Sequence, residues 1–122
     1  MSLTKRRSTG PSPAVRQLVW ERDGGCCVRC GIYGGVHTFP PHQIHHRVPR
    51  GMGGAKREGV NSPANLVLLC GGYCHRYIES DRLKGLETGY LVRQGHDPAT
   101  TPIRYRGRWV LLTHDGQIKE CP

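Results

Sequence analysis

The chain has 122 residues, of which 36% are hydrophobic, and 17 Gly and 9 Pro interrupt it often. This length predicts one domain, whose small apolar core needs further support. No apolar run approaches the ~18–20 residues of a membrane span, and none resembles a secretory signal, so we expect a cytoplasmic protein. A net charge of +9, from 18 Lys and Arg against 9 Asp and Glu, favours a polyanionic partner, above all nucleic acid; the alternative is a solvated cationic face.

The predicted elements begin with a basic arm, residues 1–12, which is rich in Ser, Thr, Gly and Pro, lacks periodicity and should be flexible. A helix is expected from Pro13 to about Arg22, because its apolar residues recur at helical spacing. Ser12 can cap its start, and the sequence Asp-Gly-Gly from position 23 should end it.

Further along, residues 66–69 form a short apolar strand, and a second helix is expected from Cys74 to about Leu83, ending near Gly85. Alternating residues around an Asp-Gly turn signal at 115–116 predict a β-hairpin at about 103–120. This hairpin either contacts DNA through its arginines or covers the core. Its cations are Arg104, Arg106 and Arg108.

Two closely spaced cysteine pairs carry the first chemical argument. Cys27 and Cys30 form a C-x2-C pair, and Cys70 and Cys74 form a C-x3-C pair. In a reducing compartment such pairs indicate metal, not disulfides, and four thiolates close a tetrahedral structural zinc site. Cys26 competes with Cys27 for the first position, and we favour Cys27 because C-x2-C is the commoner spacing.

The histidines carry the second argument. His45 and His46 lie between the cysteine pairs, Asn65 precedes the apolar strand, and His75 directly follows Cys74. A divalent cation can stabilise the charge that develops on a phosphodiester during hydrolysis, and a neutral imidazole can take a proton from the attacking water. The set therefore has the residue types that metal-dependent phosphodiester cleavage requires.

This order of His-His, Asn and His, with a cysteine pair on each side, resembles the HNH endonucleases, especially the small free-standing proteins of phages and bacteria. The likeness covers about residues 15–83. It implies an α+β fold with a ββα-metal core, to which this chain adds the N-terminal helix, the four-cysteine zinc site and the C-terminal β-hairpin. Residues 13–85 would be the nuclease core, and residues 86–122 an extension within the same domain.

The resemblance also implies roles for individual residues. His46 would be the general base, and His45 and His75 would hold the catalytic cation. Asn65 would tie the connecting loop across the hairpin and so orient the base. Glu79 lies one helical turn after His75 and is a candidate third ligand, which suits Mg²⁺ or Mn²⁺, with Ni²⁺ and Zn²⁺ as further candidates.

Three arginines adjoin the expected site and are candidate phosphate contacts, namely Arg47, Arg50 and Arg76; solvated charges are the alternative for each. The predicted function is an endonuclease that hydrolyses double-stranded DNA with little sequence preference, as a monomer. Genome packaging beside a phage terminase is one setting that the resemblance implies. The alternative is a zinc-ribbon module that binds nucleic acid without cutting it, although such a module would need neither the histidines nor Asn65.

Overall fold

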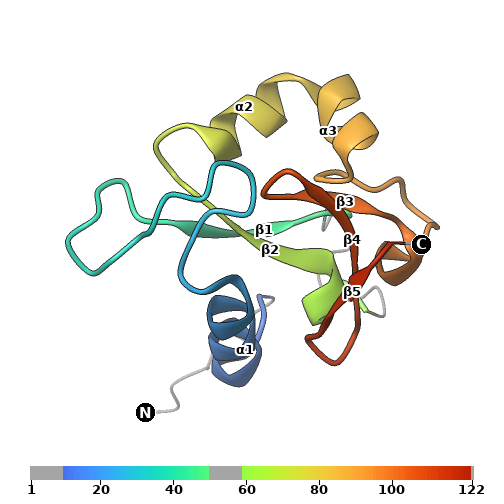
Figure 1. Cartoon of the computed structure of the whole chain (residues 1–122), viewed down its shortest axis with the longest axis horizontal. Coiled ribbons are helices and arrows are strands. Elements are labelled where there is room, and N and C mark those ends of the chain that lie inside the picture. Colours follow the sequence, from blue (N-terminus) through green and yellow to red (C-terminus); the bar gives the residue numbers. More distant parts are fainter. Residues whose placement is uncertain (1–9, 50–58, 122) are drawn as a thin grey trace, which may run out of the picture.

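The computed structural model describes residues 10–49 and 59–121, and it is an α+β fold (Figure 1). Its first element is the helix α1, Pro13–Asp23. The Ser12 side chain accepts a hydrogen bond from the Val15 backbone N–H (3.2 Å), and Gly24 ends the helix with a φ of 66°. The predicted helix is thus confirmed, including its cap and its stop.

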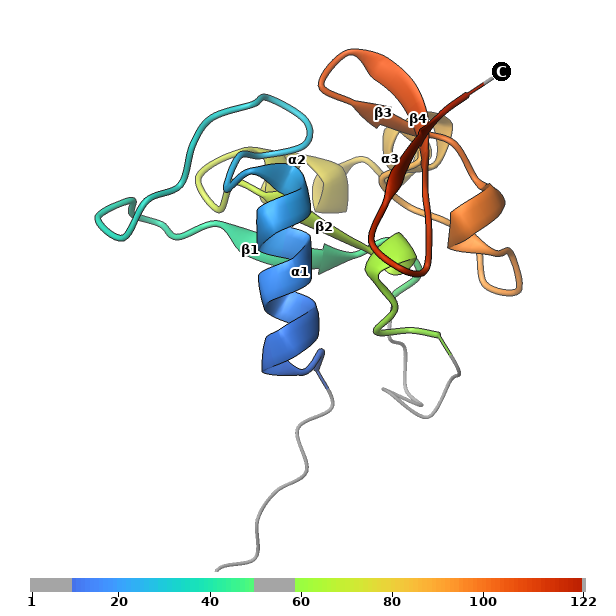
Figure 2. The same ribbon diagram turned by 60° about the horizontal axis from the view of Figure 1, so that its bottom comes forward.

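The centre of the molecule is an antiparallel hairpin of β1, Gln43–His46, and β2, Leu66–Leu69. A 3-10 turn, η2, Pro63–Asn65, leads directly into β2, and all four residues of β2 are buried. Figure 1 shows α1 and the helix α2, Cys74–Ser80, on opposite sides of this hairpin, and Figure 2 shows α1 crossing it. The hairpin is therefore covered on both faces, which explains why β2 lacks polar residues.

The second predicted helix is wrong in its extent. It breaks at Asp81, whose φ of −133° and ψ of 83° are not helical, and a new helix, α3, runs Arg82–Thr88. The Asp81 side chain accepts from the Lys84 N–H (3.1 Å), so this residue caps α3 instead of continuing α2. Gly85 does not end a helix; it lies within α3, where Leu91 fills the space that a Cβ would need. The chain leaves α3 at Gly89, with a φ of 81°.

The C-terminal region contains the 3-10 turn η3, Pro98–Thr100, and a three-stranded antiparallel sheet of β3, Ile103–Tyr105, β4, Arg108–Leu112, and β5, Ile118–Glu120. The predicted Asp-Gly turn joins β4 to β5. Apolar residues of β3 and β4 are buried in the same core cluster as Val67 and Leu69 of β2. The sheet therefore covers the core, which is one of the two roles that the sequence analysis considered for this region.

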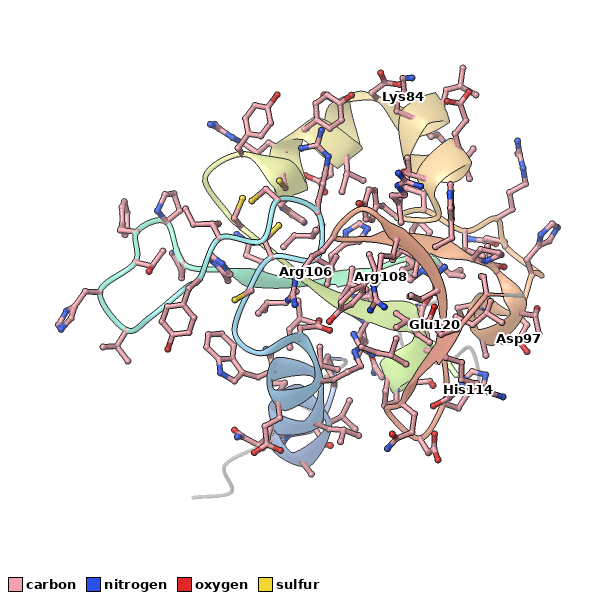
Figure 3. The ribbon with its side chains drawn as sticks, in the orientation of Figure 1. Lys84, Asp97, Arg106, Arg108, His114 and Glu120 are labelled. Carbon is pink, nitrogen blue, oxygen red and sulfur yellow. The ribbon has the colours of Figure 1, made fainter. Side chains whose placement is uncertain are left out.

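The three arginines of this region are exposed, and each already has a partner. Arg106 donates to the backbone carbonyl oxygens of Cys27 (3.3 Å) and Cys26 (2.9 Å), and Arg108 pairs with Glu120 at 2.8 Å (Figure 3). Arg104 lies over the Trp109 ring, 5.5 Å from its centroid. Much of the cationic charge here stabilises the fold.

A buried polar network supplements the small apolar core. Asp23 is fully buried and pairs with Arg22 at 2.8 Å, and its carboxylate also accepts from the Tyr105 hydroxyl (2.8 Å) and the Leu68 N–H (3.0 Å). These bonds join α1, β2 and β3. A second link runs from η2 through His114 to η3, since His114 hydrogen-bonds Ser62 and Asp97 (Figure 3). Within the described residues no helix has the length and hydropathy of a membrane span.

Candidate functional site

The four predicted cysteines meet at one point between the start of α2 and the loop after α1. The sulfur atoms of Cys27, Cys30, Cys70 and Cys74 all lie within 4.8 Å of one another. Among the described residues this is the only cluster of three or more His, Cys, Asp or Glu side chains placed to share an ion. Cys26 is not in it; its thiol faces the Gly24 carbonyl oxygen (3.4 Å). The cluster thus contains Cys27, the residue that the commoner C-x2-C spacing favours.

The surroundings of the cluster suit thiolate ligands of a cation. Backbone N–H groups point at the sulfur atoms, from Cys30 to Cys27 (3.5 Å) and from Cys74 to Cys70 (3.3 Å), and Arg29 donates to the Cys74 sulfur at 3.3 Å. Burial raises the pKa of the Cys74 thiol, so its thiolate form needs positive charge nearby. Four sulfur donors in this arrangement fit a structural zinc ion.

A separate cleft of about 390 Å³ lies between the end of β1 and α2. It brings together the predicted His45, His46, His75 and Glu79. Neighbouring strand residues normally point to opposite faces, but His46 is the last residue of β1 and its side chain also lines the cleft. The other residues that line the cleft are Ile44, Pro49, Arg82 and Leu91.

His45 is oriented as a metal ligand would be. It is 6% exposed, and its Nε2–H donates to the Tyr90 carbonyl oxygen at 2.8 Å, so Nδ1 is the nitrogen with the lone pair. Burial lowers the pKa of His45 to about 4, with a smaller contribution from His75, and the ring is neutral at pH 7. A hydrogen bond of this kind to the second ring nitrogen is what fixes the orientation of metal-bound histidines in general.

The rings of His45 and His75 face each other edge to face, with centroids 5.6 Å apart. An ion about 2.1 Å from one nitrogen of each ring fits such a separation. His75 Nδ1 lies 3.8 Å from a carboxylate oxygen of Glu79, whose side chain is 62% exposed. Glu79 therefore borders the histidine pair without forming a compact triad with it.

His46 makes a contact that the sequence did not reveal. Its Nε2–H donates to the side-chain oxygen of Asn61 at 2.8 Å, which makes Nδ1 the basic nitrogen of the ring. Asn61 lies in the connection between the strands, where nothing in its spacing singles it out. In the structure it directly follows Val60, whose carbonyl oxygen accepts a hydrogen bond from Asn65.

Asn65 ties the connection between the strands to the end of β1. The side chain is 1% exposed; its oxygen accepts from the Val48 N–H (2.7 Å), and its amide donates to the carbonyl oxygens of Val48 (3.2 Å) and Val60 (2.8 Å). The hydrogen bonds thus follow the pattern that the resemblance implies. They also position Asn61, the residue after Val60, against His46.

The prediction that Arg47 contacts phosphate is wrong. Arg47 is fully buried, and its guanidinium donates to four backbone carbonyl oxygens, those of Gly89, Ala64, Pro98 and Thr101, at 2.7–2.9 Å. It follows His46 in sequence, but its side chain enters the core and joins η2, η3 and the end of α3. A cation committed to four carbonyls within the protein has no surface to offer to DNA.

Of the other two predicted phosphate contacts, the structure describes only one. Arg50 lies outside the described residues. Arg76 is exposed on α2, with one long hydrogen bond to the Gly72 carbonyl oxygen (3.4 Å), and can reach a ligand from there. Arg82, which the sequence did not single out, is exposed and lines the histidine cleft directly. It starts α3, so the break at Asp81 brings it to the cleft.

Comparison with known proteins agrees with this geometry. The family model described as HNH endonuclease matches residues 27–81, just under half of the chain, and this segment runs from the first cysteine of the cluster to the end of α2. No curated protein and no solved structure shows significant similarity to the chain. The matched segment contains the cysteine cluster, the β1–β2 hairpin and all three cleft histidines. Residues 27–81 of the chain are therefore similar to the HNH endonuclease domain.

Proposed function

We propose that this protein is a metal-dependent endonuclease that hydrolyses phosphodiester bonds of double-stranded DNA. The observation that carries the proposal is the pairing of the His45 and His75 rings, with centroids 5.6 Å apart, in a cleft that His46 also lines. The net charge of +9 favours the same polyanionic substrate. One described cation, Arg82, stands at this cleft and can contact a phosphate.

His45 and His75 would hold a divalent cation, with Glu79 as a third ligand if its exposed side chain turns toward the pair. When bound, the cation would stabilise the charge that develops on the phosphate oxygens. Imidazole favours Ni²⁺ or Zn²⁺ and carboxylate favours Mg²⁺ or Mn²⁺, so a site with both ligand types has all four ions as candidates. The four cysteines would hold a second, structural zinc ion, worth about 10–16 kcal/mol of apparent folding free energy in small zinc domains.

His46 is proposed as the general base. Its Nε2–H donates to Asn61, so the lone pair of the neutral ring is on Nδ1, and a neutral imidazole is the form that a general base requires. Asn65 and Asn61 act as positioning residues, because Asn65 fixes the backbone of Val60 and Asn61 fixes the ring. General-base catalysis of this kind contributes about 10²–10⁴ to a rate.

Nicking of supercoiled plasmid tests the proposal. The purified protein should nick in the presence of Mg²⁺, Mn²⁺ or Ni²⁺ and stop on addition of EDTA. His46→Ala should lower the rate at least 10²-fold, while the zinc content, melting temperature and DNA affinity stay unchanged. Binding without nicking under every metal would instead favour a zinc-ribbon module, and full activity of His46→Ala would reject the assigned base.

Action beside a phage terminase during genome packaging is a prediction from the resemblance alone. Co-purification with the terminase of the same genome, together with the plasmid assay, would test it. The expected state of the free protein is a monomer, which sedimentation measures.

A further inference from the structure

The loop of residues 31–42, which joins the first cysteine pair to β1, presents apolar side chains to solvent. Val36 is 95% exposed and Phe39 is 90% exposed, more than any other large apolar side chain in the described residues. Ile32 and Tyr33 in the same loop are also exposed. In Figure 1 this loop projects from the body of the molecule beyond the start of β1. Val36 and Phe39, two apolar side chains almost fully exposed on a projecting loop, therefore mark a candidate interaction surface.

The base of this loop is fixed to the cysteine pair. The N–H of Cys27 and the Nε2–H of His42 both donate to the Ile32 carbonyl oxygen, at 2.9 and 2.8 Å, and the Gly34 N–H donates to Gly25 (2.9 Å). The imidazole of His42 packs against Gly34 so closely that a Cβ there would lie 2.4 Å from its Nδ1. The two ends of the loop are thus joined to each other.

The tip and the returning segment are also defined. Thr38 donates from its N–H to the Gly35 carbonyl oxygen at 3.0 Å, which closes a turn just before Phe39. Gly71, in the second cysteine pair, approaches Pro41 so closely that a Cβ would lie 2.4 Å from its carbonyl oxygen. The apolar tip is therefore held in place before any partner binds, which lowers the entropic cost of binding.

The position and charge of the loop favour DNA as its partner. Phe39 precedes His45 by six residues, which span at most about 20 Å, or about six base-pair steps of ~3.4 Å. No Asp or Glu lies between Asp23 and Glu58, so neither the loop nor β1 carries a negative side chain that would repel a phosphate backbone. A duplex bound at the histidine cleft can therefore extend as far as the loop.

Resting on the nuclease function proposed above, we propose that loop 31–42 is an apolar wedge that enters the minor groove of duplex DNA and unstacks a base step near the cleavage site. Val36 and Phe39 are the inserting side chains. Phe and other apolar side chains are used in this way by proteins that kink DNA from the minor groove. Because the side chains of Val36 and Phe39 have no hydrogen-bonding groups, they respond to the deformability of the duplex and not to its base sequence.

The test uses the full chain carrying His46→Ala, in Mg²⁺, with a 24-base-pair duplex labelled with a donor and an acceptor dye at its ends. Binding should raise energy transfer because the duplex bends. Adding Val36→Ser and Phe39→Ser together should abolish this rise and weaken binding at least 10-fold. The dependence of affinity on salt should keep its slope, because no phosphate contact is lost.

Leu83→Ser, at an apolar residue of α3 that is 65% exposed, is the matched control and should change neither bending nor affinity. Phe39→Leu should retain bending, because it keeps the apolar wedge. Zinc content and melting temperature verify that each variant folds.

Equal bending by the loop variant would overturn the wedge, and so would a loss of affinity with a smaller salt slope. Self-association of the parent protein that the loop variant lacks, seen by sedimentation, would assign the loop to a second copy instead. If the wild-type protein nicks plasmid while bending is unaffected by the loop, only the wedge fails. If it neither binds nor nicks duplex DNA, the proposed function fails with it.

Discussion

Replacement of Arg47 by Ala should strongly destabilise the protein. The substitution removes the donor from four carbonyl oxygens, of which those of Gly89 and Ala64 are in buried hydrogen bonds. A buried acceptor left without a partner costs about 1–3 kcal/mol, so these two alone cost about 2–6 kcal/mol. Small domains are stable by only about 5–15 kcal/mol, so Arg47→Ala should be poorly folded.

Urea unfolding of the zinc-loaded protein, followed by circular dichroism, measures this loss. Arg47→Lys should fall between wild type and Arg47→Ala, because an ammonium group has three donors and lacks the planar fork that reaches separate carbonyls. Arg76→Ala is the matched control at an exposed arginine and should stay within about 0.5 kcal/mol of wild type. A stable Arg47→Ala that loses DNA affinity, with a salt slope smaller by about one, would refute the buried role.

Three further predictions concern the two proposed metal sites. Cys30→Ser should lose zinc and unfold, whereas Cys26→Ser should keep both zinc and melting temperature, as metal analysis and thermal melts would show; equal stability of the two variants would contradict the cysteine site. Asn65→Ala leaves three buried backbone groups without their partner, at a cost of about 1–3 kcal/mol each, so it should lower the melting temperature; where the variant stays folded, it should slow plasmid nicking more than it weakens DNA binding. Glu79→Gln should raise the Mg²⁺ concentration needed for half-maximal nicking without changing the melting temperature, and an unchanged metal requirement would remove Glu79 from the ligands.

The parts of the fold that the sequence predicts are those with local signals. Ser12 and Pro13 mark the start of α1, and the close spacing within each cysteine pair indicates a metal site independently of the fold of the residues between the pairs. The prediction that His45 and Asn65 lie on a hairpin and His75 on the following helix comes only from the family resemblance. Periodicity alone does not show that β1 pairs with β2, because residues 47–65 separate them.

Two errors in the secondary structure have local physical causes. The turn between β3 and β4 consists of Arg106 and Gly107, with φ values of 48° and 85°. Two-residue hairpin turns with positive φ at both positions usually start with Asn, Asp or Gly, so an Arg gives no signal there. The neighbours of Asp81 are helix formers and predict a helix that continues through it, yet its side chain accepts from the Lys84 backbone N–H and starts a new helix.

The roles of Arg47 and Asn61 depend on the tertiary fold. Arg47 is adjacent to His46 in a basic segment, which is the pattern of a phosphate contact. Its burial depends on carbonyl groups from η2, α3 and η3, which only the folded chain brings together. Asn61 lies beside Val60, whose carbonyl oxygen accepts from Asn65, and no spacing rule predicts a contact with His46 from such an arrangement. Local patterns therefore predicted ligand types better than they predicted which polar side chains orient them.

The central claim is that this chain has two metal sites of different chemistry, one of sulfur and one between imidazoles. Anomalous scattering from crystals grown with zinc and soaked in Mn²⁺ tests it most directly, with data collected on each side of the zinc edge and at a longer wavelength where manganese scatters strongly. The expected result is a zinc peak among Cys27, Cys30, Cys70 and Cys74, and a manganese peak between His45 and His75. Strong manganese density elsewhere in the molecule, with none between the two imidazoles, would contradict the claim.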